Sequence, residues 1–420
     1  SRLAARLFDP TVPCGSVIAL VGSELLWRFS ISGLSTMLLL NIVVLLTICL
    51  AAIERRAREN VEPRSRLILL GLAAGLLVGL GTLTRYSFGW LILPVGLFLA
   101  ISVPRGRLVL PLAAVLAFLV LLTPWLARNH ALSGTLFGTA GYASMEDIYP
   151  LKSDQIMRAL ETPATESDLA NAALRKLMVN LPPILQFEVA TLGGSWLASF
   201  FLVGLLVPFV DPGRNRLRWF VVTALLLWMA AQALGRSQLS TEDPVHGESL
   251  IVLLAPLVVI FGIALFTTLL DQLPLTFFRA REAVTAGFLL LLCLPLIRAI
   301  LPPRRIIHPF PPYHPLYLQT LCGWMEPDEL MMGDLPWAIA WYGDRQAIWL
   351  THRLSDPRHQ NDLYAVHDLH KPVRALYLSH QTLDQPMFTA FYDQQDRGSW
   401  GHFASGLIQT HRRIQETIRH

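Results

Sequence analysis

The chain has 420 residues, of which 53% are hydrophobic and 15% charged, and its formal net charge is +4 at pH 7. Because soluble domains carry about 25% charged residues, this composition excludes a disordered chain, a coiled coil and an ordinary soluble enzyme. The basic residues lie in short clusters between long apolar blocks, a pattern that gives no indication of nucleic-acid binding. The apolar blocks predict a helical protein that crosses a membrane several times and contacts membrane lipid.

Nine apolar blocks predict transmembrane helices. A helix needs about 20 residues to cross the hydrocarbon core, so the shorter blocks leave a merged or re-entrant pair open around 67–102. Within one block, GLAAGLLVGLG (71–81) spaces small residues as closely packed membrane helices do. The predicted spans are 15–30, 34–52, 67–83, 88–102, 108–126, 191–210, 219–234, 249–270 and 283–301.

Clusters of Lys and Arg predict the orientation. They alternate with the spans so that four basic loops share one side, which the positive-inside rule assigns to the cytoplasm. The opposite side then carries a long loop at 127–190 with a helical segment, SDLANAALRKLM, a short polar loop at 235–248 and the C-terminal region. The basic loops are 54–66, 104–107, 211–218 and 271–282.

Residues 302–420 are more polar and predict a separate extracytoplasmic domain behind a Pro-rich linker. Strand-like and helix-like segments alternate in it, which indicates a small α/β domain with a partly parallel sheet. The predicted organisation is therefore an α-helical polytopic membrane domain at 1–301, with about nine spans, followed by this α/β domain. Its predicted strands are ELMMGD, QAIWLT and VRALYLSH, and its predicted helices are PWAIAWYG and HQNDLYAVHDLH.

Two clusters of polar residues lie where apolar spans end. Arg85 and Tyr86 follow the span 67–83, and Arg128 follows the span 108–126. A guanidinium at such a place can hold a phosphate through paired hydrogen bonds. The alternative is that these residues are interfacial anchors, since Arg and Tyr both favour the depth of the lipid headgroups.

A third cluster lies between two spans, in RSQLSTEDPVHGESL (236–250). Arg236 could add a further cation. Asp243, His246 and Glu248 could supply a general base or ligands for a divalent cation, and no other cofactor is indicated. The alternative is an ordinary hydrated loop.

A fourth cluster, GDLPWAIAWYGDRQAIWL (333–350), is rich in aromatic residues and belongs to the C-terminal domain. Trp337 and Trp341 could stack on the rings of a sugar or acceptor. Asp334 and Arg345 could bond its polar groups. The alternative is that the stretch forms the core of a small domain, and for the two tryptophans this is the favoured interpretation.

Sequence features of several other membrane-protein classes are absent. The chain has no phosphate-binding loop of a nucleotide-driven pump. The four cysteines are scattered, without the spacing of metal ligands or of a disulfide framework. These absences disfavour a transporter without excluding one.

Three segments, in this order, resemble the C-type-fold glycosyltransferases, the group that contains protein O-mannosyltransferases and lipid A aminoarabinose transferases. They are GLLVGLGTLTRYS, PWLARN followed by LSG, and DLPWAIAWYGDRQAIWL. The resemblance implies an enzyme of a bacterial inner (plasma) membrane. Such an enzyme moves a sugar from a polyprenyl-phosphate carrier to an acceptor protein, lipid or polysaccharide on the outer face. It also implies that Arg85, Tyr86 and Arg128 bind the donor phosphate, with Arg236 as a weaker candidate.

The chain departs from this group in one respect. The group's catalytic carboxylate lies in its first outer loop, and from the resemblance we expect the chain to begin after the corresponding loop. We therefore expect that carboxylate upstream of Ser1, with Asp243, His246 and Glu248 as secondary candidates. Two alternatives stay open. One is a transporter or flippase of a lipid-linked anion, and the other is a scaffold whose C-terminal domain binds a partner.

Overall fold

The chain forms two compact units in a computed structural model. The membrane unit comprises 1–144 and 170–304, and the C-terminal unit comprises 145–169 and 305–420. The second unit therefore includes a segment far upstream of the boundary expected at residue 302. The structure describes residues 2–8, 11–59, 63–103, 107–137, 157–158, 166–194, 196–207, 209–235, 245, 249–274, 279–301, 314–351 and 371–379.

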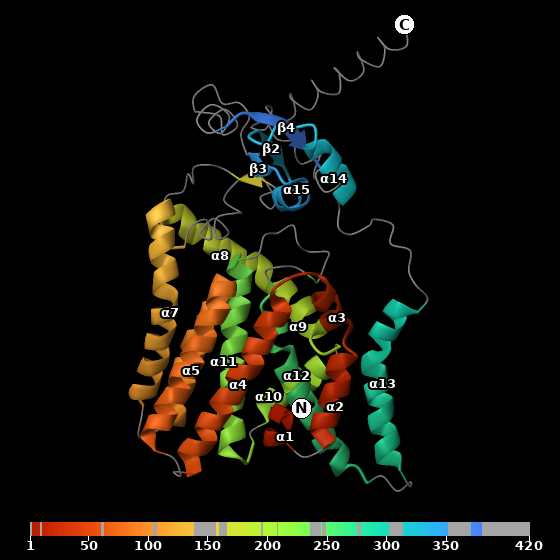
Figure 1. Ribbon diagram of the computed structural model, residues 1–420. Coiled ribbons are helices and arrows are strands. Elements are labelled where there is room, and N and C mark those ends of the chain that lie inside the picture. The colour runs from red at the N-terminus through yellow and green to blue at the C-terminus, as the bar shows by residue number, and fades with distance from the viewer. Residues whose placement is uncertain are drawn as a thin grey trace. The chain divides into compact units, whose positions relative to one another are not determined.

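The membrane unit is a bundle of helices built from the apolar blocks of the sequence (Figure 1). Its core contains large side chains such as Leu46, Leu50 and Trp228, none of which is exposed. Close packing of this kind holds helices together in lipid, where water does not drive their association. The elements are α1 (Arg2–Leu7), α2 (Thr11–Val21), α3 (Glu24–Ile31), α4 (Thr36–Glu59), α5 (Arg64–Thr84), η1 (Tyr86–Leu91), α6 (Ile92–Ser102), α7 (Val109–Ser133), α8 (Glu166–Pro183), η4 (Ile184–Glu188), α9 (Val189–Thr191), α10 (Trp196–Leu206), α11 (Pro212–Gly235), η5 (Ile251–Leu254), α12 (Ala255–Gln272) and α13 (Ala280–Ile300).

Six helices among the described residues are long and apolar enough to cross a membrane, and there are up to eight spans if each of two bent helix pairs is one span. The pair α2 and α3 bends by 54°, and the pair formed by 173–191 and α10 bends by 107°. Each of the nine predicted blocks contains helix, but the block at 88–102 lies in a helical segment, Tyr86–Ser102, that is shorter than a full crossing. The part of the chain that the structure describes therefore contains six to eight candidate spans, against the nine expected from the sequence. The six long spans are α4, α5, α7, α11, Ile251–Gln272 and α13.

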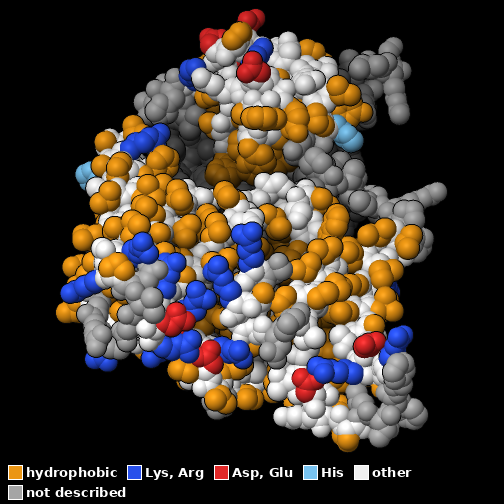
Figure 2. Space-filling view, turned by 60° about the horizontal axis from the view of Figure 1, so that its bottom comes forward, with side chains coloured by type: hydrophobic (Ala, Val, Ile, Leu, Met, Phe, Trp, Pro, Cys, Tyr) orange, Lys and Arg blue, Asp and Glu red, His pale blue; other side chains and the backbone are white. Residues whose placement is uncertain are grey.

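Ion pairs hold together one end of the membrane unit, where α4 and α6 end and α11 begins. The Arg216 guanidinium lies 3.2 Å from a carboxylate oxygen of the buried Glu54 and 3.4 Å from the carbonyl oxygen of Ser102. Arg58 pairs with Asp211 on the turn before α11. Three of the predicted basic loops therefore meet at this end, called the basic end below. Figure 2 shows Lys and Arg side chains gathered there among a few acidic ones.

Asp211 lies outside the predicted spans. Partial burial raises the pKa of its carboxyl, but the N–H of Gly213 and the guanidiniums of Arg58 and Arg214 outweigh burial and bring the pKa below its ordinary value. A carboxyl whose pKa is lowered by folding stabilises the protein at pH values above the unfolded-state pKa, about 4. That contribution is lost as the pH falls through the lower folded-state pKa.

Small residues allow α5 and α7 to pack closely. Gly75 faces Ala114, and a Cβ added at Gly75 would lie 2.8 Å from the Ala114 Cα and overlap its carbonyl group. Gly71 and Gly79, one turn away on either side, face α7 in the same way. The small-residue spacing in this block is therefore a helix-packing motif, as predicted.

The C-terminal unit contains a sheet whose strand order is β1-β3-β2-β4 and in which each pair is parallel. Two helices accompany it, and Leu318, Met331 and Ile339 form part of the core between helices and sheet. This arrangement confirms the predicted parallel α/β region. The elements are β1 (Met157–Arg158), α14 (Pro315–Cys322), β2 (Leu330–Gly333), α15 (Pro336–Gly343), β3 (Gln346–Thr351) and β4 (Val373–Tyr377).

The strands β2, β3 and β4 and the helix α15 lie where the sequence predicts them. The helix predicted at 359–370 lies outside the described residues. Within the core of this unit, Cys322 is buried, and burial raises the pKa of its thiol although Arg345 lowers it.

Candidate functional site

Arg85 ends α5 at the end of the membrane unit opposite the basic end. Its partly buried guanidinium donates to the carbonyl oxygen of Ser249 at 3.1 Å. The same guanidinium lies 3.5 Å from the hydroxyl oxygens of Ser35 and Thr36. Arg85 thus joins the start of α4, the end of α5 and the segment before η5. A cation positioned by three elements is preorganised for a ligand, because its orientation is fixed before the ligand binds.

The residues that follow Arg85 contact the end of α7. The hydroxyl oxygen of Tyr86 accepts hydrogen bonds from Nε1 of Trp125 at 2.6 Å and from Nδ2 of Asn129 at 2.8 Å. The ring of Tyr86 meets the ring of Phe137 edge-on, with centroids 5.7 Å apart. The exposed Arg128 guanidinium lies over the Trp125 ring, 4.9 Å from its centroid. Two motifs that are about 40 residues apart therefore form one polar and aromatic cluster.

A carboxylate that is absent from the predicted site, Glu188, lies near this region. It is the last residue of the π-helical turn η4, and such turns are rare and frequent at functional sites. Its Oε2 accepts a hydrogen bond from Nε2 of Gln232 on α11. Gln232 is buried, and its Oε1 accepts hydrogen bonds from the N–H groups of Leu250 at 2.8 Å and Ile251 at 3.1 Å. These two bonds fix the carboxamide so that its NH₂ group points to Glu188.

Glu188 gives one signal in the sequence. It is the single charged residue in the apolar run ILQFEVATL (184–192), and ionisable residues in such runs are functional candidates by default. The predicted span began only at residue 191, which assigned Glu188 to a loop. Gln232 lies inside a predicted span and gives no comparable signal, because a neutral amide changes the apolar pattern little.

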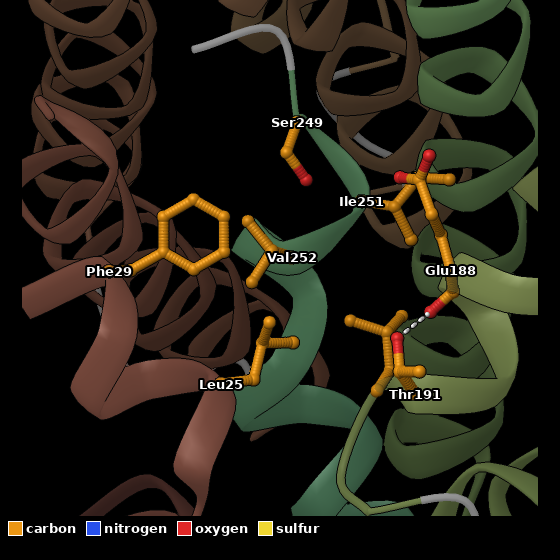
Figure 3. A pocket seen from close by; sticks show the side chains of 8 residues that line it. Leu25, Phe29, Glu188, Thr191, Ser249, Ile251 and Val252 are labelled. Carbon is orange, nitrogen blue, oxygen red and sulfur yellow. Dashed lines mark hydrogen bonds between the residues drawn. The ribbon is translucent and has the colours of Figure 1, made fainter. Parts of the chain in front are cut away.

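Glu188 and Ser249 line a small cavity of about 10 Å³. Leu25 and Phe29 of α3 lie across it from Thr191 and Glu188 (Figure 3). The hydroxyl of Thr191 donates to the main-chain oxygen of Glu188 at 2.9 Å, which closes the last turn of this segment. A larger cavity of about 240 Å³ shares Leu25 and Thr191 with the first.

Four of the predicted site residues lie outside the described residues. They are Arg236, Asp243, His246 and Glu248. Their proposed roles as a cation, a base or metal ligands stay predictions. Within the described parts of the chain, no group of three or more His, Cys, Asp or Glu side chains is arranged to hold a metal ion.

The aromatic stretch of the C-terminal unit separates into buried and exposed residues. Asp334 is fully buried after β2, and its Oδ2 accepts hydrogen bonds from the N–H of Ser379 at 2.8 Å and from its hydroxyl at 2.6 Å. These bonds join the ends of β2 and β4. Trp337 is 51% exposed and Trp341 83% exposed, so the interpretation that they form the core of this unit is wrong. Arg345 donates to the main-chain carbonyl oxygen of Met325, in the loop between α14 and β2.

The two faces of α15 explain why the tryptophans are exposed. On α15 the small or aliphatic residues Ala338 and Ile339 are buried against the sheet, and the tryptophans occupy the opposite face. Trp337 retains one aromatic neighbour, Trp349 on β3, with ring centroids 5.7 Å apart. Contact of these residues with an acceptor or sugar stays a prediction.

Comparison of the chain with protein-family models, with curated proteins and with solved structures found no match.

Proposed function

We propose that the protein is a membrane glycosyltransferase that moves a sugar from a polyprenyl-phosphate carrier to an acceptor. The observation that carries the proposal is the cluster formed by Arg85, Tyr86, Trp125, Arg128 and Asn129 in a helical membrane unit. The cluster unites the first two sequence motifs that resemble the C-type-fold glycosyltransferases. It offers two guanidiniums close to the end of the apolar helices, where the phosphate of a membrane-embedded carrier would lie.

The chemistry requires cations at such a place. An acceptor hydroxyl loses its proton to a general base, and its oxygen forms a bond to the anomeric carbon of the sugar while the bond from that carbon to the phosphate oxygen breaks. The electron pair leaves with the carrier phosphate, so negative charge grows on it. Guanidiniums stabilise that charge well because they bind phosphate through paired, charge-assisted hydrogen bonds.

The distribution of charge supports an outer location for this cluster. The basic end contains the loops rich in Lys and Arg, which the positive-inside rule assigns to the cytoplasm. Arg85 ends α5, and α5 begins beside the basic end, so the cluster lies at the other end of the bundle. The last helix, α13, also begins at the same end of the bundle as the basic end and runs toward the opposite end (Figure 1). The C-terminal unit is then extracytoplasmic.

The test is transfer of a labelled sugar from a polyprenyl-phosphate donor by the protein in lipid nanodiscs. Arg128→Ala is the sharper variant, because Arg128 is exposed and lies against the Trp125 ring, so the fold should survive its loss. We expect kcat/KM to fall about 10- to 100-fold, as expected for loss of a hydrogen bond between charged groups. Arg64→Ala, at an exposed position of the basic end, is the matched control and should leave transfer unchanged.

Arg85 needs a different variant, because it also holds Ser249 in place. Arg85→Lys keeps the positive charge and loses the paired geometry of the guanidinium, so transfer should fall while the protein remains monodisperse. Full transfer by both variants would show that the cluster does not hold the donor phosphate. Movement of the lipid across the membrane with the sugar linkage intact would instead support a flippase.

A further inference from the structure

Two broken helices and a kinked one meet on one side of the membrane unit. The break between α2 and α3 lies at Gly22 and Ser23. The break before α10 contains Gly193 and Gly194, whose φ angles of 70° and 75° favour glycine. Pro295 interrupts the hydrogen bonds of α13. Irregular backbone at membrane depth is tolerated where it is buried in protein or lines a cavity.

A cavity of about 240 Å³ lies among these three interruptions. Its wall is amphiphilic, because apolar residues from α2, α3 and α13 alternate with groups that can bond a polar ligand. Glu24 and Arg28, which form an ion pair at 3.1 Å, lie on the α3 side. The lining residues are Ala19, Ser23, Glu24, Leu25, Arg28, Thr191, Gly193, Gly194, Leu292 and Pro295.

The smaller cavity beside Glu188 adjoins the larger one, because both are lined by Leu25 and Thr191. Its volume of about 10 Å³ is close to that needed by one water-sized group, so it accommodates a hydroxyl and excludes an acyl chain. Glu188 is one of the residues that line it (Figure 3), and its carboxylate accepts a hydrogen bond from Gln232. An ionised carboxylate only accepts hydrogen bonds, and a hydroxyl is a matching donor.

One wall of the larger cavity is the helix α13, which packs loosely. Only 11% of the apolar stretch of this helix is buried in the protein. Leu292 is buried at the cavity, whereas Leu290 and Leu294 are 62% and 52% exposed. In a membrane these exposed side chains contact lipid, so the cavity lies next to the bilayer.

We propose that these two adjoining cavities, the hydroxyl recess, bind the hydroxyl-bearing headgroup of a membrane amphiphile. Glu188 accepts a hydrogen bond from one hydroxyl of that headgroup, and the larger cavity holds the remainder beside α13. The inference deepens the proposed function and rests on it for the identity of the headgroup, which is a sugar on a lipid chain. The sugar belongs to the donor or to a glycolipid acceptor.

The experiment uses an alkyl glucoside with a photoreactive group in its alkyl chain, added to the protein in nanodiscs. A probe with the same chain and a trimethylammonium head serves as the hydroxyl-free comparison. We expect the glucoside to label peptides of α3 and α13 about tenfold more than the comparison probe, as loss of a hydrogen bond to a charged group predicts. Equal labelling by the two probes would overturn the proposal.

Two variants make the assignment specific. Glu188→Gln keeps the shape of the side chain and an oxygen for the Gln232 NH₂ group, so the fold should survive. It should reduce labelling by the glucoside about tenfold. Leu25→Trp should fill the junction of the two cavities and reduce labelling as well. Glu282→Gln, at an exposed carboxylate of α13, is the matched control. Undiminished labelling of both recess variants would place the hydroxyl elsewhere.

Two further experiments complete the test. One distinguishes failure of the recess from failure of the transferase assignment, and the other distinguishes the two sources of the sugar. Arg128→Ala should lose transfer and keep glucoside labelling, because it leaves the recess intact. If the wild-type protein transfers no sugar but is labelled as expected, the recess stands without the transferase assignment. Competition by unlabelled polyprenyl-phosphate sugar indicates the donor, and competition by a glycolipid alone indicates the acceptor.

Discussion

Gln232 contacts both the segment that Arg85 bonds and the carboxylate of the hydroxyl recess. It is 1% exposed and bonds three groups, namely the N–H groups of Leu250 and Ile251 and the carboxylate of Glu188. Gln232→Met preserves the approximate shape of the side chain and removes all three bonds. The change therefore tests whether this amide positions the segment that Arg85 also contacts through Ser249.

The magnitude follows from the groups that are left behind. Each buried donor without a partner costs about 1–3 kcal/mol, so the two N–H groups together predict a loss of about 2–6 kcal/mol in the free energy of unfolding. Local opening should respond first, because both N–H groups lie at the start of one short helical turn, η5. The amides of Leu250 and Ile251 should then exchange with solvent about tenfold faster or more.

Hydrogen exchange measured by mass spectrometry in nanodiscs gives the local readout, and thermal unfolding in detergent gives the global one. Gln272→Met is the matched control, because Gln272 is exposed at the end of α12. Transfer activity should fall with the local protection, since Arg85 depends on the same segment. If Gln232→Met keeps both the protection of residues 250–251 and the unfolding temperature, Gln232 does not position this segment.

Packing, charge and burial elsewhere in the chain give three shorter tests. Gly75→Ala should lower the free energy of unfolding by about 1–3 kcal/mol, because the added Cβ overlaps α7. Gly96→Ala is the control, because its added Cβ meets no neighbouring atom and should leave the free energy of unfolding unchanged. Equal stability of the two variants would contradict the close packing of α5 and α7. Asp211→Asn should lower the unfolding temperature at neutral pH. The difference in unfolding temperature between this variant and wild type should shrink below about pH 4, because the Asp211 carboxyl, whose pKa is lowered by folding, then becomes protonated. A difference that stays constant with pH would show that the charge of Asp211 does not stabilise the fold. Cys322 should react with iodoacetamide about tenfold more slowly than a cysteine placed by Trp324→Cys, at a position that is 79% exposed, and equal rates would contradict its burial.

The helices of this protein could be predicted from sequence because apolar length and charge alternation act locally. The segment SDLANAALRKLM forms part of α8, and the tail has the predicted order of strands and helix. The number of spans was less accurate, because the short block at 88–102 was taken as a span but lies in a helical segment, Tyr86–Ser102, that is shorter than a crossing. Composition also does not reveal the bend at Gly22 and Ser23, inside a block that reads as one span.

The site was predicted in part. Arg85 and Arg128 follow the ends of apolar blocks, so their position at one end of the bundle is visible in the pattern. Glu188 was missed because the predicted span began only at residue 191. Its partner Gln232 lies 44 residues away, so only packing brings the two together. The exposure of Trp337 and Trp341 was also missed, because the hydrophobicity of tryptophan does not determine which face of a short helix meets the sheet.

Arg128 differs from the arginines of the basic end in how its guanidinium is neutralised, and this difference makes it the most informative arginine to replace. At the basic end, Arg216 and Arg58 pair with the carboxylates of Glu54 and Asp211, so their charge stabilises the protein itself. Arg128, at the other end, lies on an aromatic ring and forms no ion pair with the described residues. A ring orients a guanidinium without cancelling its charge. That charge is therefore retained for an anionic ligand, and replacement of Arg128 should affect the ligand far more than the fold.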